Sequence, residues 1–189
     1  GNLLSLDDEK LIKIASGYET KAAMHISTLD ESDRFDSNLA SNILSNPNLQ
    51  EILYEDVRRV AKEKGYSAID IDFEYINGSE SEEYANFVAK LRTLGYPVIV
   101  AAAPKTSATQ KGQLYEGHNY RLLGQAADYL FVMTYEWGYT YGPPLPVAPI
   151  QNVRRVLDYA VTEVPPEKIL LGIPNYGYDW KLPFVQGTS

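Results

Sequence analysis

The sequence predicts an α/β fold built on a parallel sheet, and three observations lead to this class. Five short segments with the pattern of β-strands alternate with segments of helical periodicity along the 189 residues, which is the sequence form of parallel strands joined by helical crossovers. No Gly-rich phosphate loop follows a predicted strand, which weighs against a nucleotide-binding open sheet. Polar and aromatic residues follow the strands instead, at residues 74–75, 135–137 and 175–176. A doubly wound sheet and a (β/α)8 barrel both fit this order, and the polar strand ends favour the barrel, whose catalytic groups gather there.

Each predicted element has its own local signal. The strands are expected at about residues 21–27, 67–74, 97–103, 129–135 and 168–174. The helical region after the first strand is broken near Pro47 and resumes at about Leu49, and Gly65 is placed to end it. Ser79 or Ser81 is expected to cap the helix that follows the second strand.

Composition and charge narrow the range of partners. The formal net charge is −8 without a basic run, which argues against nucleic acid and anionic membranes. No apolar run approaches the roughly 20 residues of a membrane-spanning helix, and the start shows no signal peptide. Because the chain begins without Met, we expect a processed or partial product. Cysteine is absent, and the 15 tyrosines and two tryptophans suit the flat faces of sugars.

The most informative segment is the acidic strand at residues 67–75. Successive side chains of a strand point to opposite faces, so Asp70, Asp72 and Glu74 share one face and three large apolar residues share the other. Crowded carboxylates repel one another, which raises at least one pKa toward the range that acid catalysis needs. An ordinary half-exposed strand with a solvated polar face is the alternative interpretation of these nine residues.

The acidic strand resembles the signature D-x-x-D-x-D-x-E of glycoside hydrolase family 18, the chitinase-like barrels. Asp70, Asp72 and Glu74 match its last three acidic positions, and Tyr75 matches the aromatic residue that usually follows. Ser67 stands at the first acidic position and departs from the pattern, which puts a charge relay in doubt but leaves the final proton donor in place.

Two further signatures strengthen the resemblance. The M-x-Y motif of the sixth barrel strand matches residues 133–135, and the L-G-[IL]-P-x-Y-G stretch of the seventh matches residues 171–177. Phe73 stands where chitinases usually carry Trp, as in the bacterial branch that includes spore-cortex-lytic N-acetylglucosaminidases and sporulation glycosylases. The alignment implies that residues 1–189 belong to a single catalytic barrel and supply its strands three to seven. Strands one, two and eight then have no counterpart in the chain.

The resemblance implies a retaining hydrolysis in which the substrate, rather than the protein, supplies the nucleophile. Glu74 would protonate the glycosidic oxygen, and the 2-acetamido carbonyl of the sugar would attack the anomeric carbon. Asp72 would hold the acetamide nitrogen, and Tyr135 would hydrogen-bond the acetamide oxygen. Asp70 lies behind Asp72 and is expected to share a proton with it.

Other residues have weaker signals. Trp137 and Tyr176 are candidate sugar-stacking surfaces, although packing within loops explains them equally well. The remaining substrate-binding candidates are Tyr75, Met133 and Asn175, with core or turn roles as alternatives for the last two. The two histidines, His25 and His118, are expected to be structural or solvated.

The function that the resemblance implies is cleavage next to N-acetylglucosamine in peptidoglycan of the spore cortex or cell wall. We expect a polysaccharide as partner, no nucleic acid, no metal, no cofactor, a monomer, and an extracytoplasmic location. Chitin carries the same sugar and remains open as a substrate. A chitinase-like lectin that binds without hydrolysis is one rival. A barrel hydrolase whose three acids bind a divalent cation is the other.

Overall fold

Five parallel strands form one sheet in the order β1-β2-β3-β4-β5 in the computed structural model, which describes residues 3–4 and 6–187. In a doubly wound sheet the strand order reverses at a switch point. Here every strand lies beside its neighbour in sequence, as in a section of a (β/α)8 barrel, so the predicted fold class is confirmed. The strands are β1 Ala23–Ser27, β2 Ala68–Asp72, β3 Val98–Ala102, β4 Tyr129–Val132 and β5 Ile169–Leu171.

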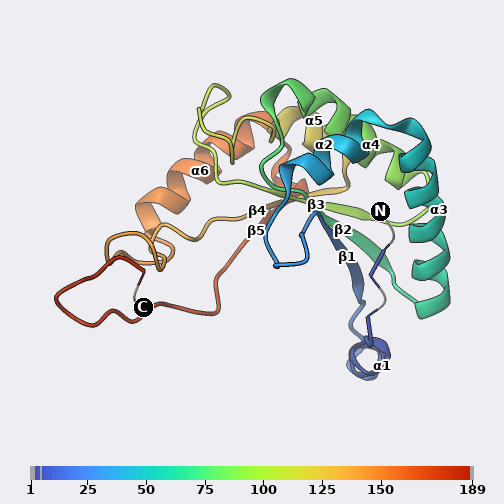
Figure 1. The fold of residues 1–189 in the computed structure, drawn as a ribbon, viewed down its shortest axis with the longest axis horizontal. Helices are drawn as coiled ribbons and strands as arrows, with labels where there is room; N and C mark the ends of the chain where they lie inside the picture. The colour runs from blue at the N-terminus through green and yellow to red at the C-terminus, as the bar shows by residue number, and fades with distance from the viewer. Residues whose placement is uncertain (1–2, 5, 188–189) are drawn as a thin grey trace.

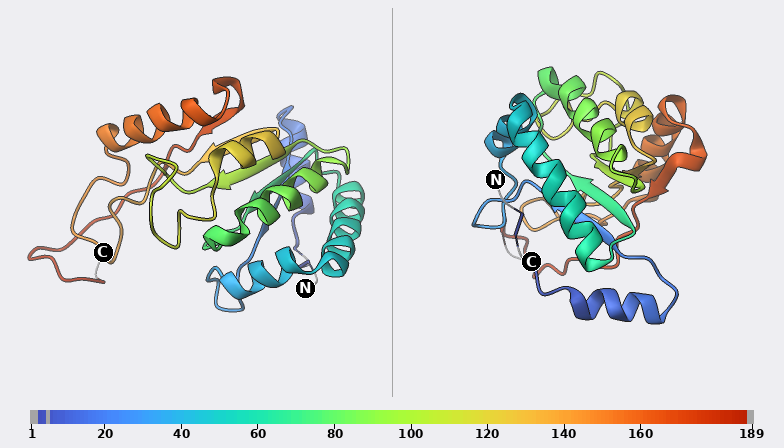
Figure 2. Two further views of the ribbon diagram at one scale, coloured as in Figure 1. Left: turned by 90° about the horizontal axis from the view of Figure 1, so that it is seen from above. Right: turned by 90° about the vertical axis from the view of Figure 1, so that its right-hand side faces the viewer.

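Helices cover one side of this sheet (Figure 1). The helices are α1 Glu9–Gly17, α2 Ser37–Ser45, α3 Pro47–Lys64, α4 Ser81–Arg92, α5 Tyr120–Ala126 and α6 Ile150–Glu163, with short 3₁₀ turns at Gly78–Glu80 and Pro166–Lys168. The helix α1, which the sequence pattern did not predict, lies apart from the helical layer in the right-hand view of Figure 2.

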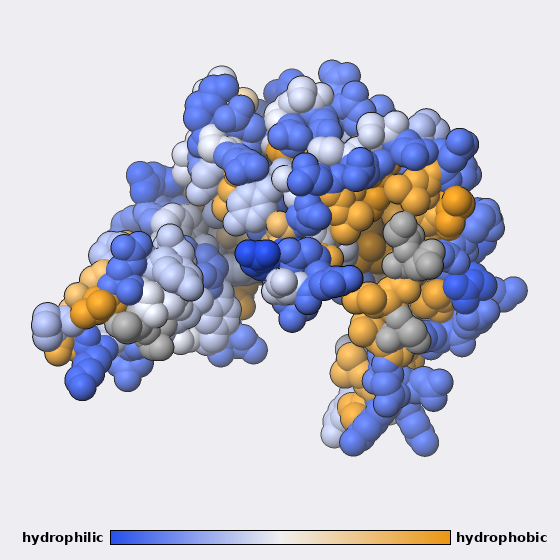
Figure 3. Space-filling model, in the orientation of Figure 1, coloured by the Kyte–Doolittle hydropathy of each residue, from blue (hydrophilic) through white to orange (hydrophobic). Residues whose placement is uncertain are grey.

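The core lies between the sheet and its helices. Ile69, Ile71 and Phe73 are fully buried, and the ring of Phe73 stacks on Tyr84 and Phe87 of α4 at centroid distances of 5.7 Å and 5.4 Å. Because side chains alternate along a strand, the acidic residues of β2 must point to the opposite face of the sheet. Figure 3 shows the molecule hollowed on that side, between the loops near the C-terminus and α1.

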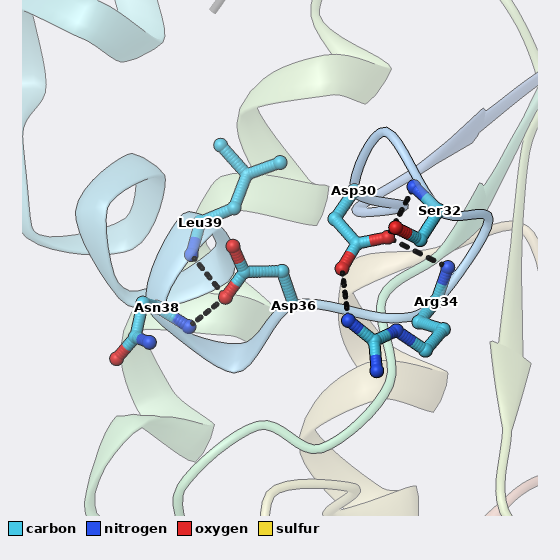
Figure 4. Close-up of polar contacts among 6 residues, drawn as sticks. All are labelled: Asp30, Ser32, Arg34, Asp36, Asn38 and Leu39. Carbon is cyan, nitrogen blue, oxygen red and sulfur yellow. Dashed lines mark hydrogen bonds and ion pairs between the residues drawn. The ribbon is translucent and has the colours of Figure 1, made fainter.

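The loop after β1 is held by two carboxylates (Figure 4). Asp36 accepts hydrogen bonds from two backbone N–H groups in the first turn of α2, at 2.8 Å and 3.3 Å. Asp30 accepts from the backbone N–H of Arg34 at 3.0 Å and from its guanidinium at 3.4 Å. The ring of Phe35, between these anchors, lies 6.4 Å from that of Tyr75. The loop is thereby connected to the segment that follows the acidic strand.

The helix boundaries confirm some predictions and correct others. Gly65 ends α3 in the left-handed conformation, with φ +79°, as expected for a C-terminal glycine. The same helix begins at Pro47 rather than at Leu49, because the Asn46 side chain accepts the N–H of Leu49 at 3.1 Å and proline fits the first helical position.

The prediction that Ser79 or Ser81 caps the next helix was wrong. A 3₁₀ turn precedes α4, and the Glu80 carboxylate accepts the backbone N–H of Asn77 at 3.3 Å and its side-chain amide at 2.8 Å. Ser81 is the first residue of α4. Asn77 and Glu80 therefore make the polar contacts that the serines were expected to make.

Four strands are shorter than expected at their carboxyl ends, whereas β1 ends at Ser27 as expected. β2 ends at Asp72 and β4 at Val132, so Glu74 and Tyr135 lie in the first residues beyond the sheet. Within the described residues, no helix combines the length and apolar character required to cross a membrane.

Candidate active site

The acidic face of β2 has a graded electrostatic environment. Burial raises the pKa of Asp72 to about 6, an effect that the negative charge of Asp70 reinforces and the positive charge of His25 opposes. Burial also raises the pKa of Glu74 to about 7, with a further contribution from the charge of Asp72. Glu74 therefore retains its proton near neutral pH in a substantial part of the molecules, as a general acid requires.

Asp72 also carries an unsatisfied acceptor. Its Oδ1 atom is buried and has no hydrogen-bond partner among the described residues. Buried polar atoms in proteins are almost always paired, and an exception calls for a specific explanation. This atom lies on the sheet face opposite the helices, and Asp72 is not one of the residues that line the cavity described below.

His25 extends the acidic face onto the neighbouring strand. It stands in register with Asp70 across the β1–β2 pair, and its Nδ1 lies 2.7 Å from Asp70 Oδ2. This hydrogen bond raises the pKa of His25. The sequence predicts a structural or solvated histidine, whereas the structure places its ring in contact with a carboxylate of the acidic face. The alternation of His25 with the buried residues Met24 and Ile26 was the available signal that it shares the acidic face.

Glu74 and Tyr135 line the same cavity, which has a volume of about 450 Å³. Three predicted substrate-binding residues, Tyr75, Met133 and Trp137, also line it, together with residues of the loops 104–115 and 136–139. Burial raises the pKa of Tyr135 to about 12, and the nearby carboxylates contribute. The phenol therefore remains a hydrogen-bond donor over the whole physiological pH range.

A glycine opposite Tyr135 leaves room for its ring. A Cβ on Gly172 would lie 2.8 Å from Cε1 of Tyr135 and 2.7 Å from the carbonyl oxygen of Val132. The buried hydroxyl of Thr134 donates to the Gly172 carbonyl at 2.7 Å, which ties the ends of β4 and β5 together. The Tyr135 ring thus packs closely against the backbone at Gly172. A residue with a side chain does not fit at this position without a shift of its neighbours.

Two predicted substrate-binding residues do not line the cavity. Asn175 is exposed after β5. The Tyr176 hydroxyl donates to the Glu136 carboxylate, which also accepts from the Tyr178 hydroxyl at 3.1 Å, and the Tyr176 ring meets that of Tyr135 edge-on at 6.4 Å. Glu136 and Tyr178 were missed because their contact joins two loops that are distant in sequence.

The backbone turns sharply after both candidate groups. Tyr75, directly after Glu74, has φ +56°, and Glu136, directly after Tyr135, has φ +66°. Residues with a side chain rarely adopt this left-handed conformation, and it persists only where surrounding contacts hold it. Among the described residues, no cluster of three or more His, Asp or Glu side chains has an arrangement that could hold a metal ion.

The comparisons with known proteins agree on one family. The sequence profile of "Glycosyl hydrolases family 18" matches residues 9–187. The chain is similar to the cortical fragment-lytic enzyme of Bacillus subtilis (strain 168), with 39% identity over 193 residues that cover 100% of this chain and 44% of the relative. The chain therefore spans less than half the length of that relative.

Solved structures show the same relationship. The fold is similar to that of the Bacillus cereus spore cortex-lytic enzyme SleL, with a TM-score of 0.93, 34% identity, and coverage of 98% of this chain and 43% of that one. A chitinase from Chromobacterium violaceum ATCC 12472 is also similar, with a TM-score of 0.85, 29% identity, and coverage of 93% and 56% of the two chains.

Proposed function

Because the chain belongs to glycosyl hydrolases family 18, we propose that it cleaves glycosidic bonds next to N-acetylglucosamine in peptidoglycan. The observation that carries the proposal is the pairing of Glu74, whose pKa is raised to about 7, with Tyr135 in one cavity. We also propose that the chain is part of a single catalytic barrel and supplies its strands three to seven.

In the proposed reaction the substrate provides the nucleophile, as in the substrate-assisted members of the family. Glu74 donates its proton to the glycosidic oxygen while the acetamide carbonyl oxygen attacks the anomeric carbon. The bond between the anomeric carbon and the glycosidic oxygen breaks, and its electron pair stays on the departing oxygen, which carries the proton from Glu74. The remaining sugar forms a cyclic oxazolinium intermediate. Water then opens the ring, and Glu74 accepts a proton from this water.

The neighbouring groups orient the acetamide. The unpaired Oδ1 of Asp72 accepts the acetamide N–H and stabilises the positive charge that develops on the ring. The Tyr135 hydroxyl donates to the acetamide oxygen and directs it toward the anomeric carbon. Asp70, hydrogen-bonded to His25 at 2.7 Å, supports Asp72 from behind. Tyr75, Met133 and Trp137 contribute the apolar walls of the sugar site.

Two lines of support favour peptidoglycan of the spore cortex or cell wall over chitin as the substrate. The similar enzyme of Bacillus subtilis is named for lysis of cortical fragments, and the similar enzyme of Bacillus cereus is named for spore cortex lysis. We propose the same extracytoplasmic location for this chain, with polysaccharide as its partner and a monomeric state. Chitin, which presents the same acetamide, is the alternative substrate.

The test is a digestion of spore-cortex muropeptides and chitooligosaccharides, with the released ends identified by mass spectrometry. We expect new reducing N-acetylglucosamine ends from the muropeptides, and no product from de-N-acetylated oligomers, which lack the attacking carbonyl. The Glu74→Gln variant should lose activity by at least about 100-fold. Near wild-type turnover by this variant would refute the proposed role of Glu74.

The same digestion separates the two rival functions. A lectin on this scaffold would bind the oligomers without releasing ends. A metal-dependent hydrolase would lose its activity in EDTA and recover it when a divalent cation is restored, because its acids would act as metal ligands. Full activity after treatment with EDTA is the result that our proposal predicts.

A further inference from the structure

We infer that His118 is a positioning residue for Glu74, because its imidazole and the adjoining Gly117 hold the backbone on both sides of the proposed proton donor. This inference rests on the proposed function. His118 lies in the segment just before α5, is fully buried and does not line the cavity. Its contribution to the reaction would therefore pass through the backbone that carries Glu74.

The imidazole joins two strands where their pairing has ended. The register of β2 and β3 runs to Ile71 and Val100, and Phe73 and Ala103 each follow the last residue of their strand. The backbone N–H of Ala103 donates to Nδ1 of His118 at 2.8 Å, and Nε2 lies 2.9 Å from the carbonyl oxygen of Phe73. The ring thus bridges the two backbone segments beyond the point where the strands pair directly.

This geometry fixes the state of the ring. Because Nδ1 accepts the N–H of Ala103, it carries no proton, and the single ring proton must lie on Nε2, where it is donated to the carbonyl of Phe73. Burial lowers the pKa of His118 to about 4, in agreement with a neutral ring. His118 therefore does not titrate over the pH range in which Glu74 would work.

The other flank of Glu74 is held by close backbone contact. A Cβ on Gly117 would lie 2.4 Å from the carbonyl oxygen of Ile76, so only glycine allows this approach. Glu74 and Tyr75 thus lie between two anchors, the Phe73 carbonyl and the Ile76 backbone. The left-handed conformation of Tyr75, with φ +56°, lies within this short span, where surrounding contacts can maintain it.

The anchoring segment is itself held in place. Lys105 is only 3% exposed, and its ammonium group donates to the carbonyl oxygen of His118 at 3.0 Å. Asn119 caps α5 by accepting the N–H of Leu122 at 3.2 Å. The segment that carries the imidazole is thus attached to the start of α5 and to the residues that follow β3.

Tyr120 provides a matched control. It is also fully buried, and its hydroxyl bridges two backbone groups by accepting the N–H of Lys105 at 2.9 Å and donating to the carbonyl of Ala103 at 2.6 Å. Both groups follow β3, and neither belongs to the segment that carries Glu74. Tyr120→Phe therefore removes a bridge that involves Ala103 and Lys105, which also contact His118, and it leaves the contact to Phe73 intact.

The experiment measures kcat, KM and the pH dependence of kcat/KM on a purified tetrasaccharide fragment of peptidoglycan, with thermal unfolding followed in parallel. His118→Leu should lower kcat about 100-fold, the effect of misplacing a reacting group by about 1 Å, and change KM less than about threefold. The alkaline limb of kcat/KM for this variant should move to lower pH. A displaced Glu74 carboxyl is more hydrated, and hydration lowers its pKa. Tyr120→Phe should keep the wild-type limb and lose less than about fivefold in kcat.

A conservative variant completes the test. His118→Gln presents one acceptor and one donor, as the neutral imidazole does, and should restore kcat to within about tenfold of the wild type. If His118→Leu does not fold, His118→Gln is compared with His118→Asn, whose shorter side chain cannot bridge both backbone groups. Higher kcat for the Gln variant supports the inference, and equal kcat for these two variants overturns it.

The result distinguishes the inference from the proposed function. Equal losses of kcat in His118→Leu and Tyr120→Phe, with no movement of the alkaline limb, would assign His118 a purely structural role and overturn the inference. If Glu74→Gln abolishes turnover in the same assay, the proposed function survives that outcome. If Glu74→Gln retains turnover, the proposed function itself fails.

Discussion

Replacement of Glu74 by Gln should make the folded protein more stable at high pH, although it removes the proposed proton donor. The carboxyl of Glu74 has its pKa raised by burial from an ordinary value of 4.5 to about 7. The folded chain therefore binds this proton more tightly than the unfolded chain. Between these two pH values the folded state loses stability as pH rises, and above the upper value the loss is complete.

The size of the effect follows from the shift. A rise of this extent, at about 1.4 kcal/mol for each pKa unit, corresponds to about 3 kcal/mol. Water at the mouth of the cavity screens the charge, which reduces the expected cost to about 1–2 kcal/mol. For a chain of this length, that cost corresponds to a change of roughly 3–6 °C in melting temperature. Glutamine has nearly the same shape and never ionises, so the variant does not lose this stability as pH rises.

The assay is thermal or urea unfolding of the wild type and Glu74→Gln at pH 4.5, 6 and 8. The stability difference should be near zero at the lowest pH and grow in favour of the variant as pH rises. Glu82→Gln is the control, because Glu82 is exposed in the first turn of α4 and should show no such growth. A constant difference, or one that favours the wild type at pH 8, would refute the view that Glu74 is held in a desolvating site.

Three further variants test the arrangement around Glu74. Tyr135→Phe removes the hydroxyl that would orient the acetamide and should lower kcat by about 100-fold with little change in KM, as measured by steady-state kinetics. His25→Gln removes a positive charge that lowers the pKa of Asp72, so the acid limb of kcat/KM should move to higher pH. Lys21→Gln, the same charge change at an exposed position outside the site, should leave that limb in place. Gly172→Ala places a methyl group 2.8 Å from the Tyr135 ring and should reduce turnover in the same assay, whereas unchanged kcat would show that the ring has room to move.

The features predicted from the sequence depend on local periodicity. The alternation along residues 67–75 placed the apolar side chains of β2 in the core and the acidic ones on the opposite face, because a strand has only two faces. Gly65 was identified as a helix stop for a similar reason, since its left-handed conformation is a local property of glycine. Signals of this kind require no knowledge of which strands are neighbours.

The features that were missed depend on contacts between distant segments. His25 meets Asp70 only because β1 and β2 pair in one particular register, which periodicity within either strand does not determine. Asn175 was expected at the substrate site because it follows a strand in sequence. It lies outside the cavity because the chain continues away from the sheet after β5, which ends at Leu171, four residues earlier.

The division of β2 into two unlike faces explains how an unfavourable group is retained at the site. Phe73 and its neighbours bury their side chains against α4, and this packing stabilises the strand independently of its acidic face. The same residue offers its carbonyl to His118, so the helix-facing side of the sheet also determines where the backbone leads into Glu74. The helix-facing side of the strand thus stabilises it and positions Glu74. The carboxyls on the other side repel one another, but the strand remains folded. Mutations on the helix-facing side should therefore affect turnover through geometry, and mutations on the acidic side through protonation.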